Sequence, residues 1–248
     1  KMSFKKILNY SPNFDETKRD KKKIRFLIFH YTGMKKESEA IKRLTDIKSE
    51  VSSHYLIKNN GEIITLVPEL YIAWHSGVSF WKNYQSLNKN SLGIEISNPG
   101  HNFKYKNFSK KQINSILLLS KYLINKYKIK PQNILGHSDI APNRKKDPGE
   151  KFPWEHLFKK KIGLWHNLDK KRLVKLRTLK INNLEKKLFY NNILKIGYSE
   201  KNFKNSKMKK MRYKKVLIKA FQRRFRQDLI NGIADQECLI ISKNLTKV

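Results

Sequence analysis

The stretch that decides the fold is IRFLIFH, residues Ile24–His30. This dense apolar run is bounded by three lysines at 21–23 and by Thr32-Gly33. A short, continuous apolar run between such boundaries is typical of a fully buried strand. Its last residue is a histidine, so we expect a buried strand that ends in a potential metal ligand.

Two further segments predict a hairpin. His54–Lys58 and Glu62–Val67 each predict a strand, and Asn60-Gly61 lies between them. Asn-Gly is the pair that type I′ turns prefer, because both central residues of that turn take a positive φ. We therefore expect an antiparallel hairpin with a type I′ turn.

Leu92–Ser97 predicts another strand, and Ile134-Leu135 predicts a short one. Between them, Ser109 and Gln112 form a capping-box pattern at the start of a helix that has an apolar side. That side contains Ile113, Ile116, Leu117, Leu123, Ile124 and Tyr127. The fold class expected is α/β, with a mixed central sheet flanked by helices.

The composition changes after Trp154. Residues 159–248 hold 26 Lys plus Arg and 6 Asp plus Glu, a net charge of +20, against +15 for residues 1–158. We expect a first domain over 1–158, a linker over 159–178 and a small all-α domain over 179–248. Lys201–Lys215 predicts a charged loop or a helix start. The helical spacing rests on Leu184 and Leu188 in one segment and on Val216, Leu217, Ala220, Phe221 and Phe225 in another.

The whole chain of 248 residues carries a formal net charge of +35. Hydrophobic residues at 39% and aromatic residues at 11% supply enough apolar area for a packed core, which excludes disorder throughout. A surface this positive attracts anionic polymers such as nucleic acid, envelope polymers or a membrane face. The abundance of Lys, Asn and Ile equally fits a bias in the base composition of the gene, so charge alone does not identify a partner.

Two absences narrow the chemistry. Cys238 is the single cysteine, which excludes an intramolecular disulfide, a cysteine-rich zinc site and an iron-sulfur cluster. The longest aliphatic stretch, Ile116–Leu119, is far shorter than the roughly 20 residues of a membrane-spanning helix, so we expect no transmembrane segment. Any metal must therefore be bound by histidine and carboxylate.

His30 ends one predicted strand, His137 follows another, and Asp147 lies ten residues later in a loop with two prolines. Two imidazoles and a carboxylate can form a three-ligand site, and zinc with three protein ligands keeps its fourth position for water. The alternative is a half-buried histidine at a strand end, with the other two residues on the surface. Spacing alone leaves both interpretations open.

Glu95 stands out because the rest of its strand is apolar, and a buried carboxylate is costly without a partner. It is either the ion-pair partner of a lysine or a general base whose pKa is adjusted by burial and a nearby metal. Lys145, two residues before Asp147, could bring an ammonium group to a developing oxyanion. Among so many lysines, an accidental position is the alternative.

Five motifs resemble, in order and spacing, the bacterial zinc N-acetylmuramoyl-L-alanine amidases of the type 2 amidase family. The resemblance covers about Ile24–Leu157, and the last motif is the most specific. The motifs are IFHYTG (Ile28–Gly33), VSSHYLI (Val51–Ile57), AWHSGVSFW (Ala73–Trp81), SLGIEISNPG (Ser91–Gly100) and GHSDIAPNRKKDPG (Gly136–Gly149).

The resemblance implies a role for each candidate. The zinc ligands of the family fall on His30, His137 and Asp147, its catalytic glutamate on Glu95, and its lysine beside the oxyanion on Lys145. Two residues, Trp74 and His75, fall in a segment that lies near the substrate groove in the family, which makes them substrate-binding candidates, with wall packing as the alternative. By the same comparison His54 is structural.

A second resemblance lies in the tail, where AFQRRFRQDLINGIAD (Ala220–Asp235) is similar to small three-helix peptidoglycan-binding modules. Such modules occur in the longer, two-domain members of the family. The lysine-rich insertion before it departs from their usual linker, and the segment also fits a plain amphipathic helix stopped by a turn.

The function implied is hydrolysis of the amide between the muramic lactyl group and L-alanine, in wall turnover or muropeptide recycling. The rivals are a non-catalytic peptidoglycan-recognition protein, against which the intact ligand set argues, and a nucleic-acid-binding protein, which leaves the motifs unexplained. We expect a monomer without a specific nucleic-acid partner, with anionic envelope polymers as possible partners. The expected location is the cell envelope or periplasm, with the cytoplasm as the alternative. Whether the substrate is intact wall or anhydro-muropeptide stays open.

Overall fold

A computed structural model describes residues 6–201 and 209–247. Its sheet is built around β3 (Phe26–Tyr31), the strand predicted from the IRFLIFH run. β3 lies between two parallel neighbours, β9 (Ser91–Ile96) and β10 (Ile134–Gly136). Residues 26–30 of β3 are buried, which explains the continuous apolar run, since strands covered on both faces do not alternate with polar residues.

The six-stranded sheet has the order β1-β5-β4-β9-β3-β10. β4 and β5 pair antiparallel and the other neighbours pair parallel, so the predicted mixed sheet is confirmed. The remaining strands of this sheet are β1 (Lys6–Leu8), β4 (Tyr55–Ile57) and β5 (Ile63–Thr65). Two small antiparallel pairs accompany it, β2 (Phe14–Asp15) with β6 (Ile72–Ala73) and β7 (Phe80–Trp81) with β8 (Tyr84–Gln85).

The predicted hairpin between β4 and β5 is confirmed, but the prediction of a type I′ turn is wrong. Gly61 has a positive φ of 86°, whereas Asn60 does not. The Asn60 side chain instead accepts a hydrogen bond from the Glu62 backbone N–H at 3.0 Å. The Gly61 N–H donates to the Lys58 carbonyl at 3.0 Å, so Asn59 and Asn60 are the central residues of the turn. A Cβ at Gly61 would lie 2.9 Å from the Lys111 carbonyl oxygen, so only glycine fits beside this helix.

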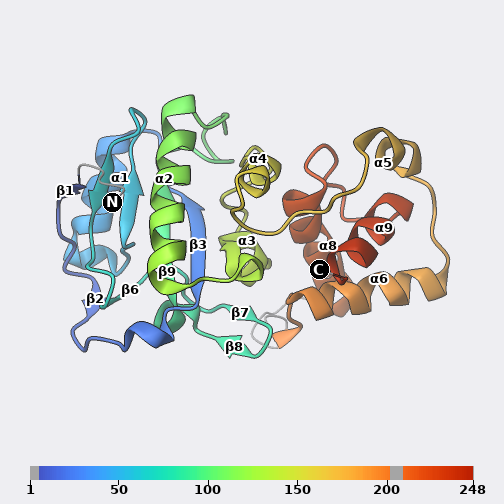
Figure 1. Cartoon of the computed structure of the whole chain (residues 1–248), viewed down its shortest axis with the longest axis horizontal. Coiled ribbons are helices and arrows are strands. Elements are labelled where there is room, and N and C mark those ends of the chain that lie inside the picture. The colour runs from blue at the N-terminus through green and yellow to red at the C-terminus, as the bar shows by residue number, and fades with distance from the viewer. Residues whose placement is uncertain (1–5, 202–208, 248) are drawn as a thin grey trace.

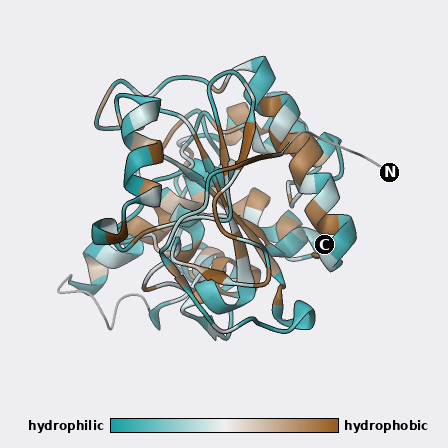
Figure 2. Cartoon of the chain, turned by 90° about the vertical axis from the view of Figure 1, so that its left-hand side faces the viewer, coloured by the Kyte–Doolittle hydropathy of each residue, from teal (hydrophilic) through white to brown (hydrophobic). Residues whose placement is uncertain are grey.

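That helix is α2 (Lys110–Tyr127), which begins at the predicted capping box of Ser109 and Gln112 and lies across the sheet (Figure 1). Figure 2 shows hydrophobic residues gathered on the inner strands and hydrophilic ones on the outer helix faces. The other helices of this part are α1 (Glu37–Thr45), α3 (His137–Ile140) and α4 (Trp154–Lys159), and short 3-10 turns lie at Lys21–Lys23, Ile47–Ser49, Leu87–Asn90 and Pro131–Asn133.

The C-terminal part is all-α in the described residues and lies beside α3 and α4 (Figure 1). Its helices are α5 (Lys170–Leu176), α6 (Asn183–Ile196), α8 (Lys210–Phe225) and α9 (Gln236–Leu245). The expected linker contains α5 and buries Trp165 and Leu173. One continuous core joins sheet residues such as Ile28 to helical residues such as Phe221, so the two parts pack together.

The sequence predictions for the C-terminal helices are met in part. Leu184 and Leu188, which marked the first helix, are 80% and 41% exposed, while Phe189 and Ile193 form its buried side. In the Lys201–Lys215 stretch, residues 202–208 lie outside the described residues, and α8 begins at Lys210, as the helix-start prediction requires. Over the described ranges, no helix has the length and apolar character needed to cross a membrane.

Candidate active site

The topology brings the three predicted ligands together. β3 and β10 are parallel neighbours, so His30 near the end of β3 and His137 directly after β10 lie at the same edge of the sheet. The loop after α3 returns to this edge, and the Ser138 backbone N–H donates to the Asp147 carbonyl at 2.8 Å. The ligand segments are therefore joined through the backbone.

The ligand atoms face one another at close range. His30 Nδ1 lies 2.9 Å from His137 Nδ1 and 3.1 Å from Asp147 Oδ2, and His137 Nδ1 lies 3.0 Å from the same oxygen. All three residues are buried. Ligands at zinc-bond length in a regular tetrahedron lie roughly 3.3 Å apart, so this donor set fits a metal ion.

The surroundings set the protonation states that a metal needs. Burial lowers the pKa of His30 to about 4 and also lowers the pKa of His137. Burial alone would raise the pKa of Asp147, but the charges and hydrogen bonds of the two histidines outweigh it and hold that pKa well below its usual value. At neutral pH the set is two neutral imidazoles and one carboxylate, the forms that bind metal.

Neighbouring side chains hold the outer nitrogen of the His30 ring, which faces away from the ligand cluster. His30 Nε2 lies 3.0 Å from His75 Nδ1, and His75 Nε2 lies 3.2 Å from Ser91 Oγ, which donates to the Leu87 carbonyl. The His75 ring fits because a Cβ at Gly93 would lie 2.5 Å from it. With a metal at His30 Nδ1, the Nε2 proton is donated to His75, which fixes the ring orientation.

His75 therefore contacts His30 and also lines the cavity. Its contact with substrate stays a prediction. Trp74 also lines the cavity, and its indole N–H donates to Asp15 at 2.7 Å. His54 is fully buried, and its Nδ1 accepts from the Gly93 N–H at 3.0 Å, as expected for a structural residue.

Glu95 lies on β9, directly opposite His30 in the register of the sheet. Its Oε2 atom is buried without a hydrogen-bond partner, and the lysine ion pairs within residues 6–201 and 209–247 are all made with other carboxylates. Burial raises the pKa of Glu95 to about 8; the Asp147 charge adds to the shift and Lys145 opposes it. An ion pair to lysine therefore does not explain this residue, which faces the site as a proton acceptor of raised pKa.

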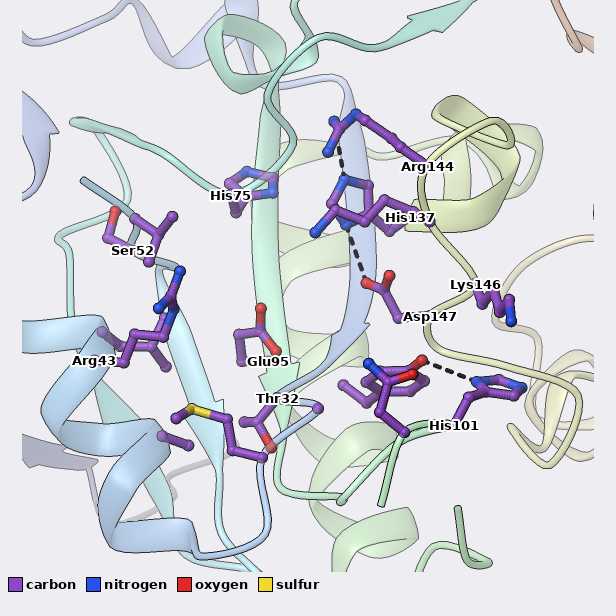
Figure 3. A pocket seen from close by; sticks show the side chains of 18 of the residues that line it. Thr32, Arg43, Ser52, His75, Glu95, His101, His137, Arg144, Lys146 and Asp147 are labelled. Atoms are coloured by element: carbon purple, nitrogen blue, oxygen red, sulfur yellow. Dashed lines mark hydrogen bonds and ion pairs between the residues drawn. The ribbon is translucent and has the colours of Figure 1, made fainter. Parts of the chain in front are cut away.

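His137, Asp147 and Glu95 line a cavity of about 400 Å³ (Figure 3), and His30 lies behind this wall in contact with His137 and Asp147. Lys145 lines it too, together with the basic residues Arg43, Arg144 and Lys146. Its role beside an oxyanion stays a prediction. Arg43 comes from α1 on the opposite wall. Sequence reasoning missed Arg43 and Arg144, because nothing distinguishes one basic residue among 55 until the fold brings it to a cavity.

His101 is a further residue that the sequence did not single out. Its Nδ1 lies 2.9 Å from the Tyr31 hydroxyl, its Nε2 lies 3.0 Å from the Glu150 carboxylate, and its ring stacks on Tyr105. Both His101 and Tyr31 line the cavity. The only available signal was the position of Tyr31 beside His30 in the first motif.

Comparison with known proteins identifies the family of this chain. The family described as N-acetylmuramoyl-L-alanine amidase matches residues 20–150. The chain is 36% identical over 235 residues to N-acetylmuramoyl-L-alanine amidase AmiD of Escherichia coli K12, covering 90% of this chain and 82% of that protein. It is 38% identical over 104 residues to 1,6-anhydro-N-acetylmuramyl-L-alanine amidase AmpD of the same organism, covering 42% and 55%.

Two solved structures match nearly the whole chain. AmiD of E. coli, in complex with the substrate anhydro-N-acetylmuramic acid-L-Ala-D-γ-Glu-L-Lys, matches with a TM-score of 0.77 and 34% identity, covering 91% of this chain and 89% of that one. AmpDh3 of Pseudomonas aeruginosa matches with a TM-score of 0.77 and 30% identity, covering 95% and 96%. The fold, the site and these similarities agree: the chain belongs to the N-acetylmuramoyl-L-alanine amidase family.

Proposed function

We propose that this chain hydrolyses the amide bond between the lactyl group of N-acetylmuramic acid and the L-alanine of peptidoglycan stem peptides, with zinc as its metal. The observation that carries the proposal is the buried set of His30, His137 and Asp147, which lies beside the unpaired carboxyl of Glu95. His137, Asp147 and Glu95 open into the same cavity. A non-catalytic recognition protein would need neither feature.

Zinc suits the donor set because two imidazoles and one carboxylate are common ligands of catalytic zinc. When bound there, zinc supplies Lewis-acid activation of a water molecule and of the scissile carbonyl. The residues around it supply the proton transfers and the positioning.

Glu95 is the general base. Burial holds Glu95 protonated in the metal-free protein, and a cation bound beside it would favour the ionised form. The ionised carboxylate then accepts a proton from the attacking water as the new carbon–oxygen bond forms, and gives that proton to the leaving nitrogen as the carbon–nitrogen bond breaks. Lys145 brings an ammonium group to the wall where negative charge develops on the carbonyl oxygen. The products are a lactyl carboxylate and a stem peptide with a free L-alanine amine.

The basic cavity wall fits an anionic substrate. Arg43, Arg144 and Lys146 line the cavity around the ligands, and stem peptides carry several carboxylates. AmiD and AmpDh3 have been solved with anhydromuramyl peptides, so we propose that this chain accepts the same muropeptide chemistry, in recycling or in wall turnover. Trp74 is the proposed apolar wall for the sugar.

The C-terminal helices are proposed to bind the wall polymer, as the resemblance of Ala220–Asp235 to peptidoglycan-binding modules implies. For location we propose the cell envelope, because helices that bind the wall polymer need access to it, with the cytoplasm as the alternative. Fractionation of cells that express the natural gene distinguishes the two locations.

The test is product analysis. Protein loaded with zinc is incubated with anhydro-N-acetylmuramyl-L-Ala-D-γ-Glu-L-Lys, and the products are identified by mass spectrometry. We expect anhydro-N-acetylmuramic acid and the intact tripeptide, with the Glu95→Gln variant as the matched control that keeps the ligands. Cleavage at any other bond, or binding without cleavage by the unmodified protein, contradicts the proposal.

A further inference from the structure

Asp139 is a buried carboxylate that the proposed reaction does not use. It lies in α3, two residues after His137, and is 1% exposed. Its Oδ2 accepts from the Gly136 backbone N–H at 2.8 Å, which joins both ends of the turn that carries the ligand. A buried carboxylate is costly without a compensating charge, so the other groups around Asp139 determine whether it is stable there.

The C-terminal helices supply that compensation. Arg224 of α8 donates to Asp139 Oδ2 at 2.9 Å, and the Tyr198 hydroxyl, from the segment after α6, donates to Oδ1 at 2.8 Å. Arg224 also donates to the Ile134 carbonyl of β10 at 2.9 Å, and its guanidinium lies 3.8 Å from the centre of the Trp154 ring. One side chain therefore holds both the strand that leads to His137 and the turn that contains it.

The preceding residue of α8 reaches the other ligand segment. Arg223 lies 3.9 Å from the carboxylate of Glu150, which follows Asp147 by three residues. Glu150 in turn holds His101 on the cavity wall. Two adjacent arginines of α8 thus contact acidic residues next to His137 and next to Asp147.

We propose that the C-terminal helical unit is part of the scaffold of the metal site, with Arg224 and Tyr198 acting as positioning residues through Asp139. This role is separate from wall binding, and only its zinc readout rests on the proposed function. It makes metal affinity dependent on residues of the helical unit that do not contact the ligands themselves.

The physical reason is that α3 has too few residues to hold its own shape. Its four residues are fixed from outside, by the Asp139 bonds and by the Ser138 N–H that donates to Asp147. Removing Arg224 leaves the Asp139 carboxylate buried with only neutral donors, which favours a rearrangement of the turn toward water. The His137 ring then loses its fixed position relative to Asp147.

The strong test compares two buried arginines of the same unit. Arg224→Met removes the contact to Asp139, whereas Arg226→Met is the matched control, because Arg226 is equally 3% exposed but pairs with Asp235 and Glu237 inside the helical unit. In metal-free full-length protein, hydrogen exchange of the peptide that contains α3 is measured by mass spectrometry. Zinc affinity is then measured by competition with a chromophoric chelator.

A milder pair keeps the test valid where an arginine variant fails to fold. Tyr198→Phe removes one hydroxyl donor to Asp139, and Tyr127→Phe removes a buried hydroxyl that donates to a different carboxylate, that of Glu69. Unfolding midpoints of all four variants show how much global stability each one loses.

We expect faster exchange of α3 and about a tenfold or greater loss of zinc affinity in Arg224→Met, with a smaller change in the same direction in Tyr198→Phe. The two control variants should leave both quantities unchanged. Unchanged α3 exchange in Tyr198→Phe and in folded Arg224→Met, or equal changes in the controls, overturns the inference. Should the unmodified protein bind no zinc, the proposed metal fails, while α3 exchange still decides this inference.

Discussion

Glu95→Gln should stabilise the metal-free protein, and more so as the pH rises. The pKa of Glu95 moves from 4.5 to about 8 on folding, which corresponds to about 5 kcal/mol between its protonation states. Water in the cavity screens this partly exposed residue, so we expect about 2 to 4 kcal/mol. Glutamine keeps the shape of the side chain and removes the charge.

The sign follows from linkage. A group whose folded-state pKa is raised contributes stability below its unfolded pKa of 4.5, and that contribution is lost as the pH rises through about 8. Glutamine does not titrate, so the variant lacks this pH-dependent contribution to stability. The ligand histidines titrate in both proteins, so their contributions cancel in the difference. The free energy of unfolding of the variant minus that of the unmodified protein should therefore increase from pH 5.5 to pH 8.5.

The assay is guanidinium unfolding at these two pH values, followed by tryptophan fluorescence with a chelator present. Repeating it with zinc should shrink the difference, because a nearby cation favours the charged carboxylate. A difference that stays constant between the two pH values would refute the claim that burial holds Glu95 protonated.

The remaining predictions concern catalysis and the tail. His137→Ala should lose both zinc, measured by metal analysis, and activity. Glu95→Gln should keep zinc while turnover falls by roughly 10² to 10⁴, the usual contribution of a general base; unchanged turnover would remove it from the mechanism. Lys145→Ala should cost a few kcal/mol of transition-state stabilisation, seen as a lower kcat at unchanged zinc content. A chain ending at Phe158 should show a lower unfolding midpoint and weaker zinc binding than the full chain, because it removes the partners of Asp139; an equally stable and active truncation would contradict the packing described above.

The elements that could be predicted are those fixed by local sequence. The buried run before His30 and the capping box of Ser109 and Gln112 each depend on residues close together in the chain, and both predictions are confirmed. The type I′ prediction at Asn60-Gly61 was wrong because the turn closes one residue earlier, with the Gly61 N–H donating to the Lys58 carbonyl. Leu184 lies on the exposed side of α6. Apolar residues occur on more than one side of this helix, so the sequence pattern alone does not show which side is buried.

In the site, too, some residues could be predicted from the sequence and others depend on contacts between distant segments. Spacing left His30, His137, Asp147 and Glu95 open, and the resemblance of the motifs to the amidase family singled them out. The structure brings the three proposed ligands together and sets Glu95 opposite His30 in the sheet. The second role of His75 and the Asp139–Arg224 contact were not found. Arg224 lies 85 residues from Asp139 in the chain, and no local pattern identifies one arginine as the partner of one carboxylate.

The most direct test of the central claim is a zinc titration of activity. Chelator-treated protein is reconstituted with increasing zinc, and release of tripeptide from anhydro-N-acetylmuramyl-L-Ala-D-γ-Glu-L-Lys is measured beside bound metal. We expect no hydrolysis without metal and activity that rises linearly to one zinc per chain, with neither binding nor activity in Asp147→Ala at the same zinc concentrations. Full hydrolysis by protein shown to be metal-free would contradict this expectation.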